Sequence, residues 1–231
     1  MQRVLLEPAY VLHSMPYRDT SLIVDLITKQ YGRVSVVARS ARGPKSRYQG
    51  RLQSFVPLLV SYTGRYELKN LNQIELSRKP YDLVGKNMLC GFYLNELLMR
   101  LLQKDESCPD VYEEYQKTLS DLERGECVET VLRLFEKNLL FRLGYGLALD
   151  NEALTLQPIR SELHYRFLVE QGFVLVEADE SDHTVFSGET LLAMHNGKLN
   201  TPNVLKEAKR LMRLVLAYYL DGRAIKSREL F

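Results

Sequence analysis

The spacing of apolar residues changes near Pro80, and this change limits the folds that the chain can adopt. Before Pro80, short apolar runs are rich in strand formers, and residues 33–38 alternate polar with apolar side chains, as a half-buried strand does. After it, leucines recur at helical spacing between Leu94 and Leu102. Strands in the first part and helices in the second favour an α+β protein.

The first 80 residues contain five short runs that are typical of β-strands. Pro57 lies inside the fourth run and favours a sheet edge or a bulge there. Five antiparallel strands in so short a segment suit a small closed barrel. We expect an OB-fold, and an SH3-like barrel fits the pattern nearly as well. The runs lie at 10–13, 22–27, 33–38, 55–62 and 67–76.

Residues 81–231 predict an α-helical domain with one small β-hairpin. Thr201 is a typical N-cap, and Pro202 suits the first turn of a helix that we expect to end near Tyr219. Gln171-Gly172 predicts the turn of a hairpin within 165–176. The expected domains are therefore 1–80 and 81–231. Further helices are expected around 94–102, from Pro109, across 128–143 and after Ser187.

The two parts of the chain carry opposite net charge. Residues 1–80 hold 13 Lys and Arg against 5 Asp and Glu, a net charge of +8, although the whole chain of 231 residues carries only +2. The remaining residues therefore carry −6. Such an asymmetry indicates a polyanion, and foremost a nucleic acid, as the partner of the basic part.

The composition also bears on the compartment. No apolar stretch is long enough for a transmembrane helix, and the first residues lack the pattern of a signal peptide. The three cysteines are widely spaced and make neither a disulfide framework nor a zinc site. We expect a reduced cytoplasmic protein without a membrane span, a metal or a cofactor.

The most informative segment is residues 39–51, here called the basic loop. It has five cations and no acid in 13 residues, with Gly43-Pro44 as a turn. Closely spaced cations neutralise successive phosphates, and an aromatic side chain among them can stack on a base. The alternative is a solvated loop that binds nothing in particular. The predicted nucleic-acid-binding surface consists of Arg33, Arg39, Arg42, Lys45, Arg47, Tyr48, Arg51, Arg65 and Lys69.

Catalytic patterns are lacking in the sequence. The four histidines are scattered, and neither GxSxG nor a Gly-rich dinucleotide loop occurs. A nuclease or other hydrolase needs acids close to the basic loop, but none lies between Asp25 and Glu67. We expect a binding protein rather than an enzyme.

Several short segments, in their order and spacing, resemble the RecO family of bacterial recombination mediators. The resemblance covers nearly the whole chain, and it agrees with the predicted barrel, basic loop and helices. The segments that carry it are 9–14, 17–24, 32–34, 38–42, 53–58, 93–97, 143–146 and 225–231.

The resemblance implies an N-terminal OB-fold domain that binds nucleic acid and a helical domain that binds proteins. It also implies a non-enzymatic role in DNA repair and homologous recombination, with binding of single- and double-stranded DNA and annealing of complementary strands. RecO-like proteins act with RecR and engage the acidic, phenylalanine-ending tail of single-strand binding protein. Together these proteins promote RecA loading, which places the protein in the cytoplasm at the nucleoid.

Some members of this family carry a four-cysteine zinc site in the C-terminal half. Residues 146–151 contain no cysteine, so we expect the zinc site to be absent here. The hairpin within 165–176 must then be held by packing.

A tail that is acidic and ends in an aromatic residue needs an apolar pocket rimmed by cations. Two predicted helices offer those residue types, although the basic face of the last helix, which also includes Lys206, could equally be solvated. An RNA-binding OB-fold accessory factor stays open as the alternative function, since single-strand grooves accept both nucleic acids. The predicted tail-binding residues are Arg133, Phe135, Leu139, Lys209, Arg210 and Arg213.

Overall fold

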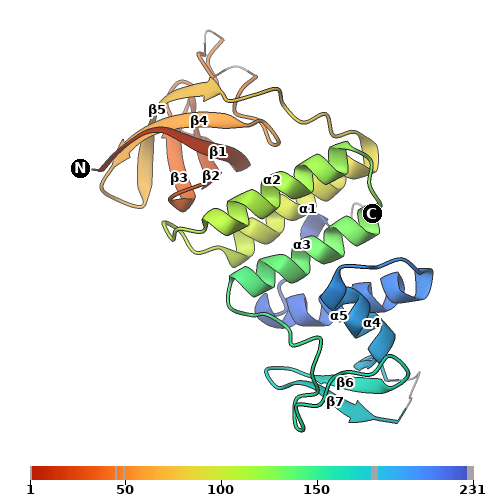
Figure 1. Ribbon diagram of the computed structural model, residues 1–231. Helices are drawn as coiled ribbons and strands as arrows, with labels where there is room; N and C mark the ends of the chain where they lie inside the picture. The colour runs from red at the N-terminus through yellow and green to blue at the C-terminus, as the bar shows by residue number, and fades with distance from the viewer. Residues whose placement is uncertain (1, 45, 49, 178–181, 228–231) are drawn as a thin grey trace. The chain divides into compact units, whose positions relative to one another are not determined.

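The computed structural model describes residues 2–44, 46–48, 50–177 and 182–227 (Figure 1). These residues form two compact units. The first unit holds the chain up to Glu126 together with the described residues from Ile225 onward, and the second holds Cys127–Ala224. The first unit thus runs past residue 80, where the sequence suggests a boundary.

A closed five-stranded barrel begins the first unit. Its strand order is β1-β2-β3-β5-β4, and β3 pairs with β5 in parallel whereas the other neighbours are antiparallel. This OB-like arrangement confirms the expected fold class, although the sequence suggested antiparallel pairs alone. The strands are β1 (Gln2–Tyr17), β2 (Ser21–Thr28), β3 (Gly32–Ala38), β4 (Leu58–Gly64) and β5 (Leu68–Leu76).

The long first strand closes the barrel. Its earlier half pairs with β4 and its later half with β2. The pairing register shifts between Val4 and Glu7 and again between Val11 and His13, and such bulges bend a strand. Alternate residues of β3, such as Val34 and Val36, are fully buried in the core, in keeping with the period of two.

Two helices complete the first unit, α1 (Gly85–Leu101) and α2 (Pro109–Glu123). Asn95 of α1 connects them to the barrel. Its amide nitrogen donates to the Leu12 carbonyl at 3.0 Å and to the Ser54 hydroxyl at 3.2 Å, and its amide oxygen accepts from the Tyr115 hydroxyl at 2.6 Å. A buried amide with these partners fixes both helices to β1 and to the segment that follows the basic loop.

The described residues of the second unit form three helices and a small sheet of order β7-β6-β8. The hairpin expected within 165–176 is confirmed by the pairing of β6 with β7. The helix starts expected at Ser187 and Thr201 are confirmed as well, because the side chains of these two residues accept N-cap hydrogen bonds. The short strand β8 was not expected. No helix in the described ranges is long and apolar enough to cross a bilayer. The elements are α3 (Val128–Arg142), β6 (His164–Leu168), β7 (Gly172–Val176), β8 (Val185–Ser187), α4 (Gly188–Asn196) and α5 (Pro202–Tyr219).

Candidate nucleic-acid interface

The basic loop leaves β3 and is anchored along its course. Near its start, the Arg42 N–H donates to the Thr20 carbonyl in the β1–β2 turn at 2.8 Å. In its middle, Tyr48 inserts into the barrel core. Just beyond its end, Ser54 accepts the hydrogen bond from Asn95. These three anchors attach the described residues of the loop to the β1–β2 turn, to the barrel core and to α1.

Four described arginines of the loop are exposed, and they form the candidate interface: Arg39, Arg42, Arg47 and Arg51. Arg39 donates to the side-chain oxygen of Asn70 at 3.0 Å, and Arg47 donates to the Tyr48 hydroxyl at 2.7 Å. Both acceptors are neutral oxygens, so the positive charge is not compensated by these hydrogen bonds. Lys45, the fifth predicted cation of the loop, lies outside the described residues.

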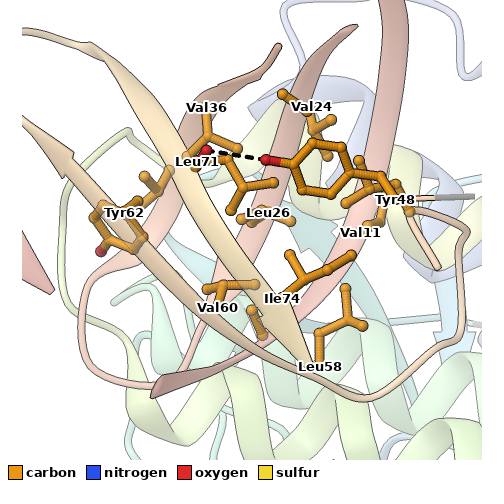
Figure 2. Close-up of a cluster of buried hydrophobic side chains, with 14 of the residues drawn as sticks. Val11, Val24, Leu26, Val36, Tyr48, Leu58, Val60, Tyr62, Leu71 and Ile74 are labelled. Carbon is orange, nitrogen blue, oxygen red and sulfur yellow. Dashed lines mark hydrogen bonds between the residues drawn. The ribbon is translucent and has the colours of Figure 1, made fainter. Parts of the chain in front are cut away.

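The structure corrects the prediction that Tyr48 stacks on a base. Its ring is only 3% exposed and packs among the core side chains of the barrel, where its hydroxyl donates to the Leu71 carbonyl at 3.1 Å (Figure 2). The Arg47 guanidinium lies over the same ring, 4.9 Å from its centroid. Tyr48 therefore holds Arg47 in place and offers no open face to a nucleobase.

Two more predicted residues, Arg33 and Lys69, have partners inside the first unit. Lys69 is 6% exposed and pairs with Asp105 at 2.5 Å. The Arg33 guanidinium donates to the Met99 carbonyl near the end of α1. Both cations connect the barrel to the helical part of the unit, which corrects their assignment to the DNA-binding surface.

Arg65 is exposed in the turn between β4 and β5, but it lies apart from the basic loop. Because Leu68 pairs with Ser35 and Asn70 with Val37 in parallel, this turn lies toward the beginning of β3. The basic loop starts at the other end of β3, roughly 20 Å away for a strand of this length. The predicted residues therefore do not form one continuous surface.

Sequence reasoning missed Arg18 in the β1–β2 turn. It is exposed, and the hydrogen bond from Arg42 to Thr20 brings its turn beside the basic loop. The sequence held a signal for this, because consecutive strands joined by a short turn commonly pair as a hairpin. In the structure Leu22 pairs with Ala38, so the residues beyond these two strand ends lie close together.

The second unit has a basic cavity of about 1220 Å³, lined by β8, the start of α4 and α5 residues from Asn203 to Leu214, together with His164 and His183. Four cations of α5 line it, together with apolar side chains that include Val185, Val204 and Leu214. Three of the predicted tail-binding residues are thus brought together here. The cations are Lys206, Lys209, Arg210 and Arg213.

Arg210 and Glu207 form a fixed wall of this cavity. The Arg210 guanidinium lies 4.6 Å from the centroid of the Phe186 ring and donates to the Val185 carbonyl at 2.5 Å. Glu207 accepts hydrogen bonds from the Ser187 hydroxyl at 2.7 Å and its N–H at 3.1 Å. Burial by itself raises the pKa of Glu207, but the hydrogen bonds from Ser187 and Thr190 outweigh it, so the pKa lies below its ordinary value.

The other three predicted tail-binding residues belong to the interior of the second unit. Phe135 and Leu139 are each 1% exposed, since they lie on the apolar stripe that α3 buries in its own core. Arg133 is buried and forms an ion pair with the fully buried Glu136. None of the three lines the cavity, which corrects their assignment to the tail pocket.

Two family models match the chain: Recombination protein O N terminal over residues 1–80, and Recombination protein O C terminal over residues 84–229. The chain belongs to the RecO family. It is 48% identical over 229 residues to DNA repair protein RecO of Coxiella burnetii (strain CbuG_Q212), covering 99% of this chain and 98% of the relative. It is 47% identical over 229 residues to DNA repair protein RecO of Methylococcus capsulatus, covering 99% and 93%.

Proposed function

We propose that the protein acts in DNA repair as a non-enzymatic mediator that binds single- and double-stranded DNA and anneals complementary strands. The exposed arginines of the basic loop carry this proposal. They project from an OB-like barrel in a chain of the RecO family, and the side chains of Arg39 and Arg47 donate to neutral oxygens. Arginine contacts to phosphates hold DNA in position without reading its sequence.

Annealing follows from the same charges. Two complementary strands repel each other through their phosphates, and each strand that is bound to the loop is partly neutralised. Two neutralised strands repel less and meet more often. No catalytic group is needed for such a role, because the product forms by base pairing alone.

A strand-annealing assay on DNA coated with single-strand binding protein tests this proposal. Wild-type protein should speed annealing, and the double variant Arg39→Glu/Arg42→Glu should not. Arg65→Glu, which reverses an exposed charge at the other end of β3, is the control for position, and it is compared with the single variant Arg42→Glu, which reverses the same number of charges. If RNA strands are annealed but coated DNA is not, the RNA-binding accessory factor is the better account.

The basic cavity of the second unit is the proposed site for the tail of single-strand binding protein. Its cations suit the acids of the tail, and Val204 and Leu214 suit the final aromatic side chain. We further propose that the protein acts with RecR to promote RecA loading, a role that rests on the family.

A pull-down with the tail peptide, with and without its last phenylalanine, tests the cavity. Arg213→Glu should abolish capture of the intact peptide and leave DNA binding unchanged. Arg213 is preferred to Arg210 because the Arg210 side chain also supports the fold through Phe186 and Val185. Lys198→Glu, an exposed charge that does not line the cavity, is the control. Equal capture by all variants places the tail elsewhere.

A further inference from the structure

The β1–β2 turn carries an aromatic and a cationic side chain in contact, and neither is used by the functions proposed above. Tyr17 is the last residue of β1 and is partly exposed, and Arg18 follows it with an exposed side chain. The Arg18 guanidinium lies over the Tyr17 ring, 5.1 Å from its centroid. The turn therefore presents an aromatic ring and a cation in contact with each other, with the guanidinium over one face of the ring.

The backbone holds this pair in an uncommon conformation. Arg18 has a φ of +51°, in the left-handed region that a bulky residue seldom adopts. The turn tolerates it because Tyr17 and Ser21 are paired on either side. Residues held in this region cluster at binding sites, where the surrounding structure overcomes the strain.

The pair lies beside the candidate DNA interface. Thr20 in the same turn accepts the Arg42 N–H at 2.8 Å, and Leu22 pairs with Ala38, the residue before Arg39. The turn also contains Asp19, an exposed acid, so the cationic character near the pair comes mainly from the basic loop.

We propose that Tyr17 and Arg18 form a stacking site for an unpaired nucleobase of a single strand whose phosphates lie on Arg39 and Arg42. Nucleobases stack on aromatic rings and on guanidinium planes, and they do so with little regard to sequence. The site rests on the DNA-binding function proposed above. It assigns to the β1–β2 turn the stacking role for which Tyr48 is too deeply buried.

Duplex DNA has no use for this site, because its bases are already paired and stacked. The site therefore favours single strands over duplexes, whereas the arginines of the basic loop contact the phosphates of both. Loss of one base–aromatic stack weakens single-strand binding by roughly 5- to 150-fold.

The chain contains no tryptophan, which allows a direct optical test. Tyr17→Trp places the only tryptophan of the chain in the proposed site, and Tyr66→Trp places it at a tyrosine that is 80% exposed in the distant β4–β5 turn. Titration with an oligothymidylate should quench the emission of the Tyr17→Trp protein and leave that of Tyr66→Trp unchanged. A duplex of the same length should bind both proteins without quenching either.

The anisotropy of a labelled oligonucleotide, measured in the same titration, distinguishes failure of the stacking site from failure of the DNA-binding function. If the strand binds and the Tyr17→Trp emission does not change, the stacking site is refuted and the DNA-binding function stands. If no protein binds the strand even in dilute buffer, both are refuted.

Affinities of two further variants supply the second readout. Tyr17→Phe should bind single strands like the wild type, whereas Tyr17→Leu should bind them roughly 5- to 150-fold more weakly and keep its duplex affinity. The salt dependence of binding should be the same in both, since neither substitution changes a cation that faces a phosphate. An equal loss for single strands and duplexes, or a normal affinity for Tyr17→Leu, would overturn the assignment.

Discussion

Replacing Tyr48 tests whether its ring stabilises the barrel core or stacks on DNA. The ring is 3% exposed among core side chains, so Tyr48→Ala removes a buried aromatic side chain. Truncations of this kind lower the free energy of unfolding by about 3–5 kcal/mol. Tyr48→Phe removes only the hydroxyl, which donates to the Leu71 carbonyl and accepts from Arg47, and a loss of about 1 kcal/mol is expected because the ring and its contact with the Arg47 guanidinium remain.

Urea unfolding measures both changes. The urea concentration at the unfolding midpoint should be highest for the wild type, lower for Tyr48→Phe and lowest for Tyr48→Ala. Tyr66→Ala is the control, because this tyrosine is 80% exposed and its loss should change the stability by no more than about 0.5 kcal/mol. DNA affinity, measured where each variant is folded, should stay close to that of the wild type for Tyr48→Phe.

One result would refute this reasoning. If Tyr48→Ala unfolds at the same urea concentration as the wild type and yet binds single strands much more weakly, the ring serves the ligand and not the core. The sequence prediction of a stacking Tyr48 would then be right, and the assignment of its ring to the barrel core would be wrong.

Two further perturbations test the anchors of the first unit. Asn95→Ala leaves the Tyr115 hydroxyl without its 2.6 Å acceptor, so urea unfolding should show a loss of about 2–3 kcal/mol; an unchanged midpoint would contradict the anchor. Glu96→Gln tests the hydrogen bonds that its carboxylate accepts from the N–H groups of Lys226 and Ser227 at 3.0 and 2.8 Å. Burial raises the pKa of Glu96, but the hydrogen bonds that it accepts, foremost from Ser227, outweigh burial and bring the pKa below 4.5. The stabilisation is therefore complete above pH 4.5 and is lost as the pH falls through the lowered pKa. Wild type should be the more stable by about 1–2 kcal/mol at pH 7, and the difference should vanish in acid; a difference that is constant with pH would contradict this role.

The sequence predicts the barrel and the helix starts well because those features depend on local patterns. The alternation in β3 and the N-caps Ser187 and Thr201 are of this kind. Burial of a loop residue such as Tyr48 follows no period, since it depends on how the chain returns over the barrel. Lys69 could have been predicted as inward-facing, because it lies two residues before the buried Leu71 on the same face of β5.

The tail pocket illustrates a second limit. Phe135 and Leu139 have the apolar character that a pocket needs, but they lie on the stripe of α3 that the helix buries for its own stability. One apolar stripe cannot serve both the core and a ligand. The cations of α5 follow from the helical period, because a helix that buries Ala208 and Leu211 turns its opposite face outward, but the cavity that they line with β8 is encoded by no single element.

If the exposed arginines of the basic loop hold DNA through its phosphates, as proposed, binding must depend on salt in a way that these arginines set. The affinity of the full chain for a duplex should fall steeply with salt on a log–log plot. For Arg39→Glu/Arg42→Glu the slope should be smaller by ~0.9 for each phosphate that the protein no longer neutralises, or by ~1.8 if each arginine neutralises one. A slope that matches that of the wild type would contradict the claim, because it would mean that neither arginine contacts a phosphate.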